Sequence, residues 1–256
     1  MFDKIFEINM NNYNIIGLTD ELKSIYIYNM FCQNKKSILL VCNSLYEANK
    51  IYNSLAKYTN KILLFPMDDF LTSEALAVSP ELEVTRLETL KSLIKNNNQI
   101  VITNLMGYLR YLPNPTTYQK NYFSINNDTQ ISIENLIKKL NNIGYTRETI
   151  VNKTGEMAVR GFVVDIFPVA YENPVRIEFW GDEIESIKEI NVDTQLTIKK
   201  IDRIEISPKT EFLTDKEKPE NELYRNLGKY TQIVNIETYL DNPITFFNDY
   251  KAIEQG

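Results

Sequence analysis

Three short apolar runs, separated by segments with helical spacing, constrain the first part of the chain most strongly. The runs are SILLVC (37–42), KILLF (61–65) and QIVIT (99–103), and each has the continuous apolar character of a strand buried on both faces. Residues 44–58 carry apolar side chains at helical spacing, and a second predicted helix follows the second run. Because alternating strands and helices favour a parallel sheet, residues 1–115 are expected to form an α/β domain.

The second predicted helix begins at Ser79-Pro80-Glu81. Serine suits the N-cap, proline suits the first helical position, and an acidic side chain favours the first turn. The apolar residues of the helix form one stripe, and its basic residues are expected on the solvent side: Arg86, Lys91 and Lys95.

The pattern changes after Pro113-Asn114-Pro115. Residues 118–125 are expected to form a strand and 131–140 a helix. Residues 145–206 contain only short alternating segments, which favour an antiparallel sheet. The predicted domains are 1–115, an inserted α+β domain at 116–208, and a segment 209–256 that returns to the first domain. We expect the chain to be part of a longer protein.

The composition excludes several classes of function. The chain has no histidine, which removes histidine-based catalysis and most transition-metal sites, and Cys32 and Cys42 are isolated and do not form a zinc ligand set. We expect no cofactor and no metal. No apolar run is long enough to span a membrane, and the first residues lack the layout of a signal peptide, so a cytoplasmic monomer is expected. The net charge of −6 does not favour coating of nucleic acid.

The stretch GLTDELKS (17–24) has part of the spacing of a phosphate-binding loop, G-x-x-x-x-G-K-[ST]. Gly17, Lys23 and Ser24 stand at the expected positions, but Leu22 replaces the second glycine. A side chain there hinders the close approach of backbone to phosphate, and two neighbouring acids oppose an anion at a helix N-terminus. We therefore predict a degenerate phosphate loop that starts an ordinary helix, with Thr19 as its cap. Asp68-Asp69 is a poor magnesium-binding pair, because two residues separate it from the end of the strand.

Several long motifs resemble a known family. Residues 63–90 and 102–115 are similar to the N-terminal region of bacterial transcription-repair coupling factors (Mfd). Residues 144–168, with G-E-x-x-x-R-G-x-x-x-D-I-F-P, and 173–195, with R-I-E-F-x-x-D-E-I-x-S-I, resemble the second domain shared by Mfd and the excision-repair protein UvrB. The resemblance covers most of residues 1–210. It implies a UvrB-like fold, in which a RecA-like parallel-sheet domain with a decayed nucleotide loop is interrupted by the inserted α+β domain.

The alternation of side chains in 174–180 places Val175, Ile177 and Phe179 on one face, which we assign to the core. Arg176, Glu178 and Trp180 then share the other face. Arginine and tryptophan are typical of protein–protein contacts, although Arg176 could instead pair with Glu178 or Glu183. The resemblance favours the contact. It implies binding of the excision-repair ATPase UvrA through Arg160, Arg176 and Trp180, with tryptophan where the family usually has phenylalanine.

The function that this resemblance implies is a non-catalytic adaptor that binds UvrA and recruits it to a stalled RNA polymerase. RNA polymerase and DNA are expected to bind only downstream domains of the full-length ATP-dependent DNA translocase. The alternatives are a UvrB-like nucleotide-binding ATPase fragment, against which Leu22 argues, and a direct DNA-binding module. The latter is disfavoured because residues 65–79 contain no insertion comparable with the DNA-gripping hairpin of UvrB.

Overall fold

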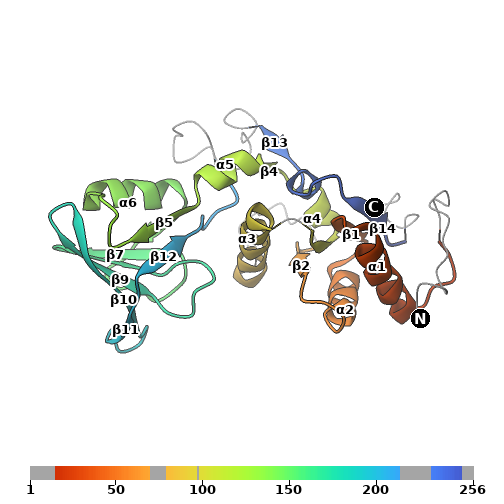
Figure 1. Ribbon diagram of the computed structural model, residues 1–256, viewed down its shortest axis with the longest axis horizontal. Helices are drawn as coiled ribbons and strands as arrows, with labels where there is room; N and C mark the ends of the chain where they lie inside the picture. The colour runs from red at the N-terminus through yellow and green to blue at the C-terminus, as the bar shows by residue number, and fades with distance from the viewer. Residues whose placement is uncertain (1–14, 70–78, 97, 214–231, 250–256) are drawn as a thin grey trace. The chain divides into compact units, whose positions relative to one another are not determined.

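The computed structural model describes residues 15–69, 79–96, 98–213 and 232–249 (Figure 1). The chain divides into two compact units, which we call unit 1 (Met1–Tyr111 with Asn235–Gly256) and unit 2 (Leu112–Val234). The domain limits predicted at 115/116 and 208/209 stay predictions, because residues 214–231 lie outside the described part of the chain.

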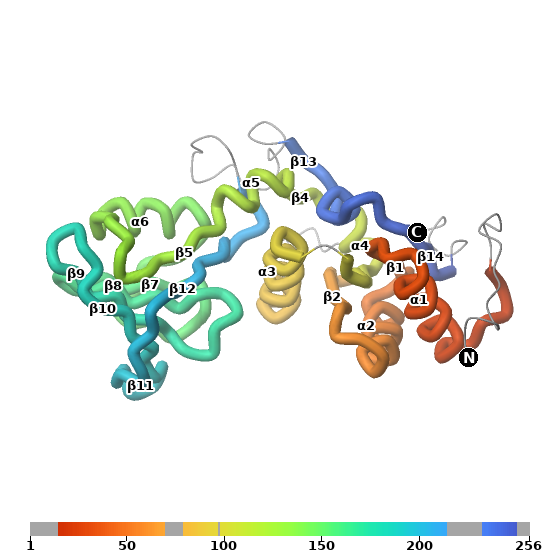
Figure 2. Tube along the Cα trace, viewed as in Figure 1, coloured from red at the N-terminus to blue at the C-terminus, as the bar shows by residue number. Residues whose placement is uncertain are grey.

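Unit 1 is built on four parallel strands in the order β14-β1-β3-β2. The three predicted apolar runs form β1 (Ile38–Cys42), β2 (Ile62–Phe65) and β3 (Ile100–Asn104). The last strand, β14 (Ile244–Phe247), is distant in sequence but pairs with the free edge of β1, as the blue segment beside β1 shows in Figure 2. The mixed α/β architecture with a parallel sheet is therefore confirmed for this unit.

The helices of unit 1 are α1 (Asp20–Asn34), α2 (Leu45–Leu55), α3 (Pro80–Lys95), the short α4 (Leu105–Tyr108) and the 3₁₀ helix η2 (Ile236–Tyr239). Helices α1 and α2 pack against each other, and their apolar side chains share a core with β1 and β3. Burial of this apolar surface is the main source of stability for such a layer. Consecutive strands β1 and β2 are not neighbours, because β3 lies between them.

Two details of α3 differ from the sequence-based expectation. Arg86 is fully buried rather than solvent-exposed, and its Nη1 donates a hydrogen bond to the main-chain oxygen of Pro66 (3.0 Å). A buried guanidinium requires polar partners, and this partner comes from the loop after β2, which helical spacing alone does not reveal. Ser79 precedes the helix as expected, but its side chain makes no capping hydrogen bond.

Unit 2 contains a six-stranded sheet in the order β11-β10-β9-β8-β7-β6. Neighbouring strands are antiparallel, except that β6 runs parallel to β7. Helix α6 (Ile133–Asn142) lies on one side of this sheet (Figure 1). The strands are β6 (Thr146–Arg147), β7 (Glu156–Arg160), β8 (Val163–Ile166), β9 (Val175–Trp180), β10 (Glu183–Ile190) and β11 (Thr197–Lys200).

The entry to unit 2 corrects one prediction. Residues 118–125 were expected to form a single strand, but the segment begins in α5 (Pro115–Lys120), and only β5 (Phe123–Asn126) is extended. Asn114 caps α5 by accepting a hydrogen bond from the Thr116 main-chain nitrogen (3.0 Å), and proline follows at the first helical position. Strand β5 pairs with β12 (Arg203–Ile206), and β4 (Leu112–Pro113) pairs with β13 (Ile233–Val234).

Two tight turns close the hairpins β7–β8 and β9–β10. Each has two residues, and each begins with a glycine at positive φ: Gly161 at 59° and Gly181 at 62°. Two-residue hairpin turns require this conformation, which glycine adopts without steric cost. Because β8 and β9 are antiparallel neighbours, the two turns lie at the same end of the sheet.

Candidate functional site

The start of α1 shows what the GLTDELKS stretch does. Thr19 is the N-cap, as predicted, and its Oγ1 accepts a hydrogen bond from the Leu22 main-chain nitrogen (3.4 Å). Ser24 is buried, and its Oγ donates to the main-chain oxygen of Asp20 (3.2 Å). The hydroxyl that would bind magnesium in a working phosphate loop is thus engaged inside the helix.

Asp20 also engages the cationic side chains of this region. Its carboxylate pairs with Lys50 Nζ (2.5 Å) and with Lys23 Nζ (3.5 Å). The hydrogen bond from Lys50 is the main reason that the pKa of Asp20 is lowered. A phosphate at this position would therefore meet a carboxylate and an already paired lysine, and the arrangement favours a helix start over a nucleotide site.

Open α/β folds bind ligands at the carboxyl end of the parallel sheet. In this chain, polar groups at that end form hydrogen bonds with one another. The Asp69 carboxylate accepts hydrogen bonds from the Leu45 main-chain nitrogen at the start of α2 (2.8 and 3.0 Å). Asn104, at the end of β3, donates to Asp69 Oδ1 (2.7 Å) and to the Met67 main-chain oxygen (2.7 Å). A carboxylate of the chain therefore occupies the helix N-terminus that would otherwise attract an anion.

Strand β9 has the two faces that its alternation predicts. Val175, Ile177 and Phe179 are buried. Arg176, Glu178 and Trp180 lie on the opposite face, which we call the outer face of the sheet, with increasing exposure toward the turn. The face assignment from sequence is therefore confirmed.

Asp165 on β8 brings the two predicted arginines together. It stands directly opposite Arg176 in the register, and its Oδ1 and Oδ2 accept from Arg176 Nε (2.7 Å) and Nη2 (2.9 Å). Arg160 Nη2, from β7, donates to the same Oδ2. The Asp165 side chain is only 1% exposed, whereas those of Arg176 and Arg160 are 20% and 47% exposed. A buried carboxylate thus orients two guanidinium groups toward the surface, and its hydrogen bond is the main reason that the pKa of Arg176 is raised.

This arrangement corrects one alternative that the sequence left open, an ion pair of Arg176 with Glu178 or Glu183. Glu178 instead accepts hydrogen bonds from Lys188 Nζ (2.5 Å) and Ser186 Oγ (2.6 Å) on β10. These donors, Lys188 first, lower the pKa of the Glu178 carboxyl. The correction arises because register, which the sequence does not state, places Asp165 opposite Arg176 and Ser186 opposite Glu178.

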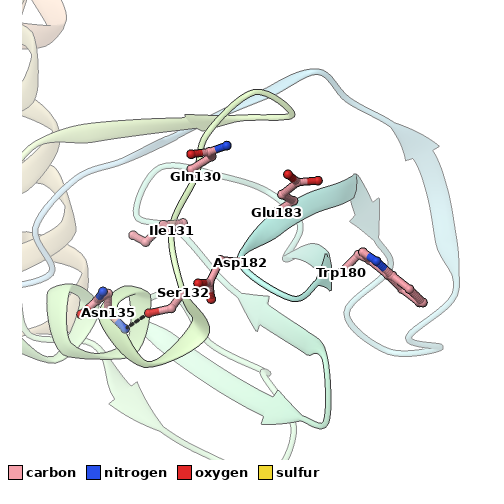
Figure 3. A pocket seen from close by; sticks show the side chains of 7 residues that line it. All are labelled: Gln130, Ile131, Ser132, Asn135, Trp180, Asp182 and Glu183. Carbon is pink, nitrogen blue, oxygen red and sulfur yellow. Dashed lines mark hydrogen bonds between the residues drawn. The ribbon is translucent and has the colours of Figure 1, made fainter.

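Trp180 ends the outer face at the β9–β10 turn, where its side chain is 79% exposed. It borders a shallow, largely polar cavity between this turn and the N-terminal end of α6, and its ring extends away from Ser132 and Asn135 (Figure 3). The other side chains that line the cavity are Gln130, Ile131, Asp182 and Glu183. Trp180 lies on the same face as Arg176, four residues further along the strand, or about 13 Å at ordinary strand spacing.

The structure therefore places Arg160 and Arg176 on one carboxylate and Trp180 further along the same face. Asp165 was not among the residues that the sequence predicted for this site. The available signal was an acidic side chain within an otherwise apolar strand, VVDI. Among the described residues, no cluster of His, Cys, Asp or Glu suits a metal ion, and no helix has the length and apolar character to cross a membrane.

Comparison with known proteins matches this part of the chain to a family. Residues 123–212 match the UvrB interaction domain, and this stretch includes the whole six-stranded sheet with Arg160, Asp165, Arg176 and Trp180. This match covers most of the described part of the second unit.

Longer matches extend into unit 1. Over 208 residues, or 80% of the chain, the sequence is 30% identical to the transcription-repair-coupling factor of Staphylococcus aureus (strain bovine RF122 / ET3-1), of which the match covers 18%. The corresponding factor of Bacillus subtilis (strain 168) is 30% identical over 201 residues, 78% of this chain and 17% of that protein. The chain belongs to the transcription-repair coupling factor family, as its N-terminal module, and spans less than a fifth of the length of these relatives.

Proposed function

We propose that this chain is the UvrA-binding adaptor module of a transcription-repair coupling factor, and that it performs no catalysis itself. The observation that carries the proposal is the outer face of β9. There a buried carboxylate holds Arg160 and Arg176, and Trp180 stays exposed, within the stretch that matches the UvrB interaction domain. In the longer protein, RNA polymerase and DNA would bind other domains, and the module would act in transcription-coupled repair in the cytoplasm.

The chemistry of this face supports a protein partner. Arginine and tryptophan dominate the binding energy of many protein interfaces, because both combine large contact area with directed hydrogen bonds or ring contacts. Arg160 and Arg176 are already oriented by Asp165, so little side-chain entropy is lost when a partner covers them. Their fixed orientation favours a contact that depends on geometry rather than on charge alone.

For unit 1, we propose descent from a RecA-like nucleotide-binding domain that has lost its ligand. The parallel sheet and the partial phosphate-loop spacing support descent. The engaged hydroxyl of Ser24, the Asp20–Lys23 pair and the bulk of Leu22 oppose nucleotide binding. We therefore place the UvrB-like ATPase alternative second.

The decisive experiment is titration of the chain with purified UvrA by calorimetry, beside the Arg176→Ala, Trp180→Ala double variant. We expect micromolar or tighter binding by the wild type and at least a hundredfold loss in the variant, because two candidate hot-spot side chains are removed. Tyr46→Ala serves as a control, since Tyr46 is an exposed aromatic residue on α2 of unit 1. Equal affinity of the wild type and the double variant would contradict the proposed site.

A further inference from the structure

The outer face of the six-stranded sheet continues beyond Arg176 toward the sheet edge. Residues directly opposite one another in antiparallel strands project from the same face. The register places Asp165 opposite Arg176, Arg176 opposite Lys188, and Lys188 opposite Lys200. One row across β8 to β11 therefore carries an aspartate followed by three cationic side chains.

The counter-charges on this face are unevenly distributed. Asp165 pairs with Arg160 and Arg176, and Glu178 pairs with Lys188. Lys200 makes no ion pair with any described residue, although Lys188 stands directly opposite it. Because Glu178 compensates Lys188, Lys200 remains as a positive charge without an ion pair at the edge of the outer face.

The adjacent lysine provides the contrast. Lys199 projects from the other face and pairs with Glu189, which stands directly opposite it (3.0 Å). A lysine on an edge strand also discourages unwanted strand pairing. Lys199 serves that purpose equally well, and it does so with its charge compensated. Edge protection therefore does not account for the uncompensated charge of Lys200.

We propose that the partner-binding face extends from Arg176 across β10 and β11 to Lys200, and that Lys200 binds a carboxylate side chain of the partner. The inference rests on the UvrA binding proposed above. Two strand spacings, about 10 Å, separate Arg176 from Lys200, so one partner surface covers both. A carboxylate placed there compensates the charge of Lys200, which has no ion pair with a described residue, and this makes an acidic group the favoured occupant.

The test compares Lys200→Glu with Lys199→Glu in titrations with purified UvrA at low and physiological ionic strength. Both substitutions change the net charge equally and lie on the same strand, so they alter long-range attraction to the same extent. They change opposite faces of the sheet, and Lys199→Glu also breaks the ion pair with Glu189. We expect the affinity of Lys200→Glu to be about tenfold weaker than that of the wild type at low salt, and this difference to decrease as salt is raised. The affinity of Lys199→Glu should stay within about twofold of the wild type.

Urea unfolding of the same variants separates binding from folding. Lys200→Glu removes no ion pair with a described residue and places a carboxylate opposite Lys188, so its midpoint is expected at or above that of the wild type. Weaker binding by an equally stable variant supports the proposal. Equal losses in both variants, or no loss in either, overturn it while leaving UvrA binding in place. If the wild-type chain does not bind UvrA, or binds it equally well without Arg176 and Trp180, the proposed site is wrong. The extension of that site to Lys200 is then wrong as well.

Discussion

One aspartate in unit 1 and one in unit 2 each bind several polar groups, but they lie in different places and have different neighbours. Asp69, at the carboxyl end of the parallel sheet, accepts hydrogen bonds from the chain's own backbone and from Asn104. Asp165, inside the antiparallel sheet, binds two arginines whose outer parts stay exposed. In the first case the polar groups satisfy one another at a sheet end where related folds bind ligands. In the second case the buried carboxylate of Asp165 orients the guanidinium groups of Arg160 and Arg176 toward the surface.

This difference supports the proposal that the sheet of unit 2, rather than that of unit 1, binds a partner. Where charged groups form hydrogen bonds only with the chain itself, their substitution should change stability alone. Where they are oriented outward, substitution should change both stability and binding. Asp165→Ala and Asp69→Ala test this distinction, and the variant with the larger expected effect comes first.

The largest effect is expected from Asp165→Ala. Removing the buried carboxylate leaves Arg176, which is mostly buried, without its counter-ion, so the free energy of unfolding should fall by about 2–3 kcal/mol. UvrA binding should weaken more than the unfolded fraction explains, because Arg160 and Arg176 lose their orientation. Urea unfolding and calorimetry on one preparation give both quantities.

The control for Asp165 is Asp182→Ala, which removes an exposed carboxylate from the neighbouring β9–β10 turn. It should change stability by less than about 0.5 kcal/mol. A stable Asp165→Ala variant with wild-type affinity would show that the arginines need no internal anchor, and the contrast between the two units would then fail.

A smaller and purely structural effect is expected from Asp69→Ala in unit 1. The substitution removes the acceptor for the Leu45 main-chain nitrogen at the start of α2, which should cost about 1 kcal/mol. UvrA affinity should stay unchanged when it is measured well below the unfolding temperature. A marked loss of affinity would indicate that unit 1 takes part in the contact and would remove the distinction between the units.

The structural features that could be predicted from the sequence are those that depend on local patterns. Apolar runs of strand length gave β1, β2 and β3, and alternation gave the two faces of β9, because both depend only on neighbouring residues. The burial of Arg86 was missed, since it depends on the main-chain oxygen of Pro66, twenty residues away in sequence.

The same limit applies to the candidate site. Arg160, Arg176 and Trp180 were chosen from motif resemblance, but Asp165 links the two arginines only through the register of β8 against β9. The register of β10 against β11 also places Lys188 opposite Lys200, and no local sequence pattern predicts this. By contrast, α5 was predictable, because Asn114 followed by proline is a common helix start, and the misprediction came from giving weight to the apolar residues after it.

The smallest predicted effect concerns pH and the Glu178–Lys188 pair. Lys188 and Ser186 lower the pKa of the folded Glu178 carboxyl below its ordinary value of 4.5. A lowered folded pKa means that the pair's stabilisation is fully present above the ordinary value and is lost as pH falls through the folded pKa. The stability difference between wild type and Lys188→Ala should therefore be largest above about pH 5 and shrink in more acidic solution. Since the pair is partly exposed, its full size should be below about 1 kcal/mol.

Lys200→Ala is the matched control for this measurement, because Lys200 lies opposite Lys188 and has no carboxylate partner among the described residues. Its stability difference from wild type should be small and constant over the same acid range, since the substitution removes no ion pair with a described carboxylate. A pH-independent difference for Lys188→Ala would mean that Glu178 does not compensate Lys188. The outer face would then carry two uncompensated lysines at its edge, and the proposed contact with an acidic partner group would have to include both.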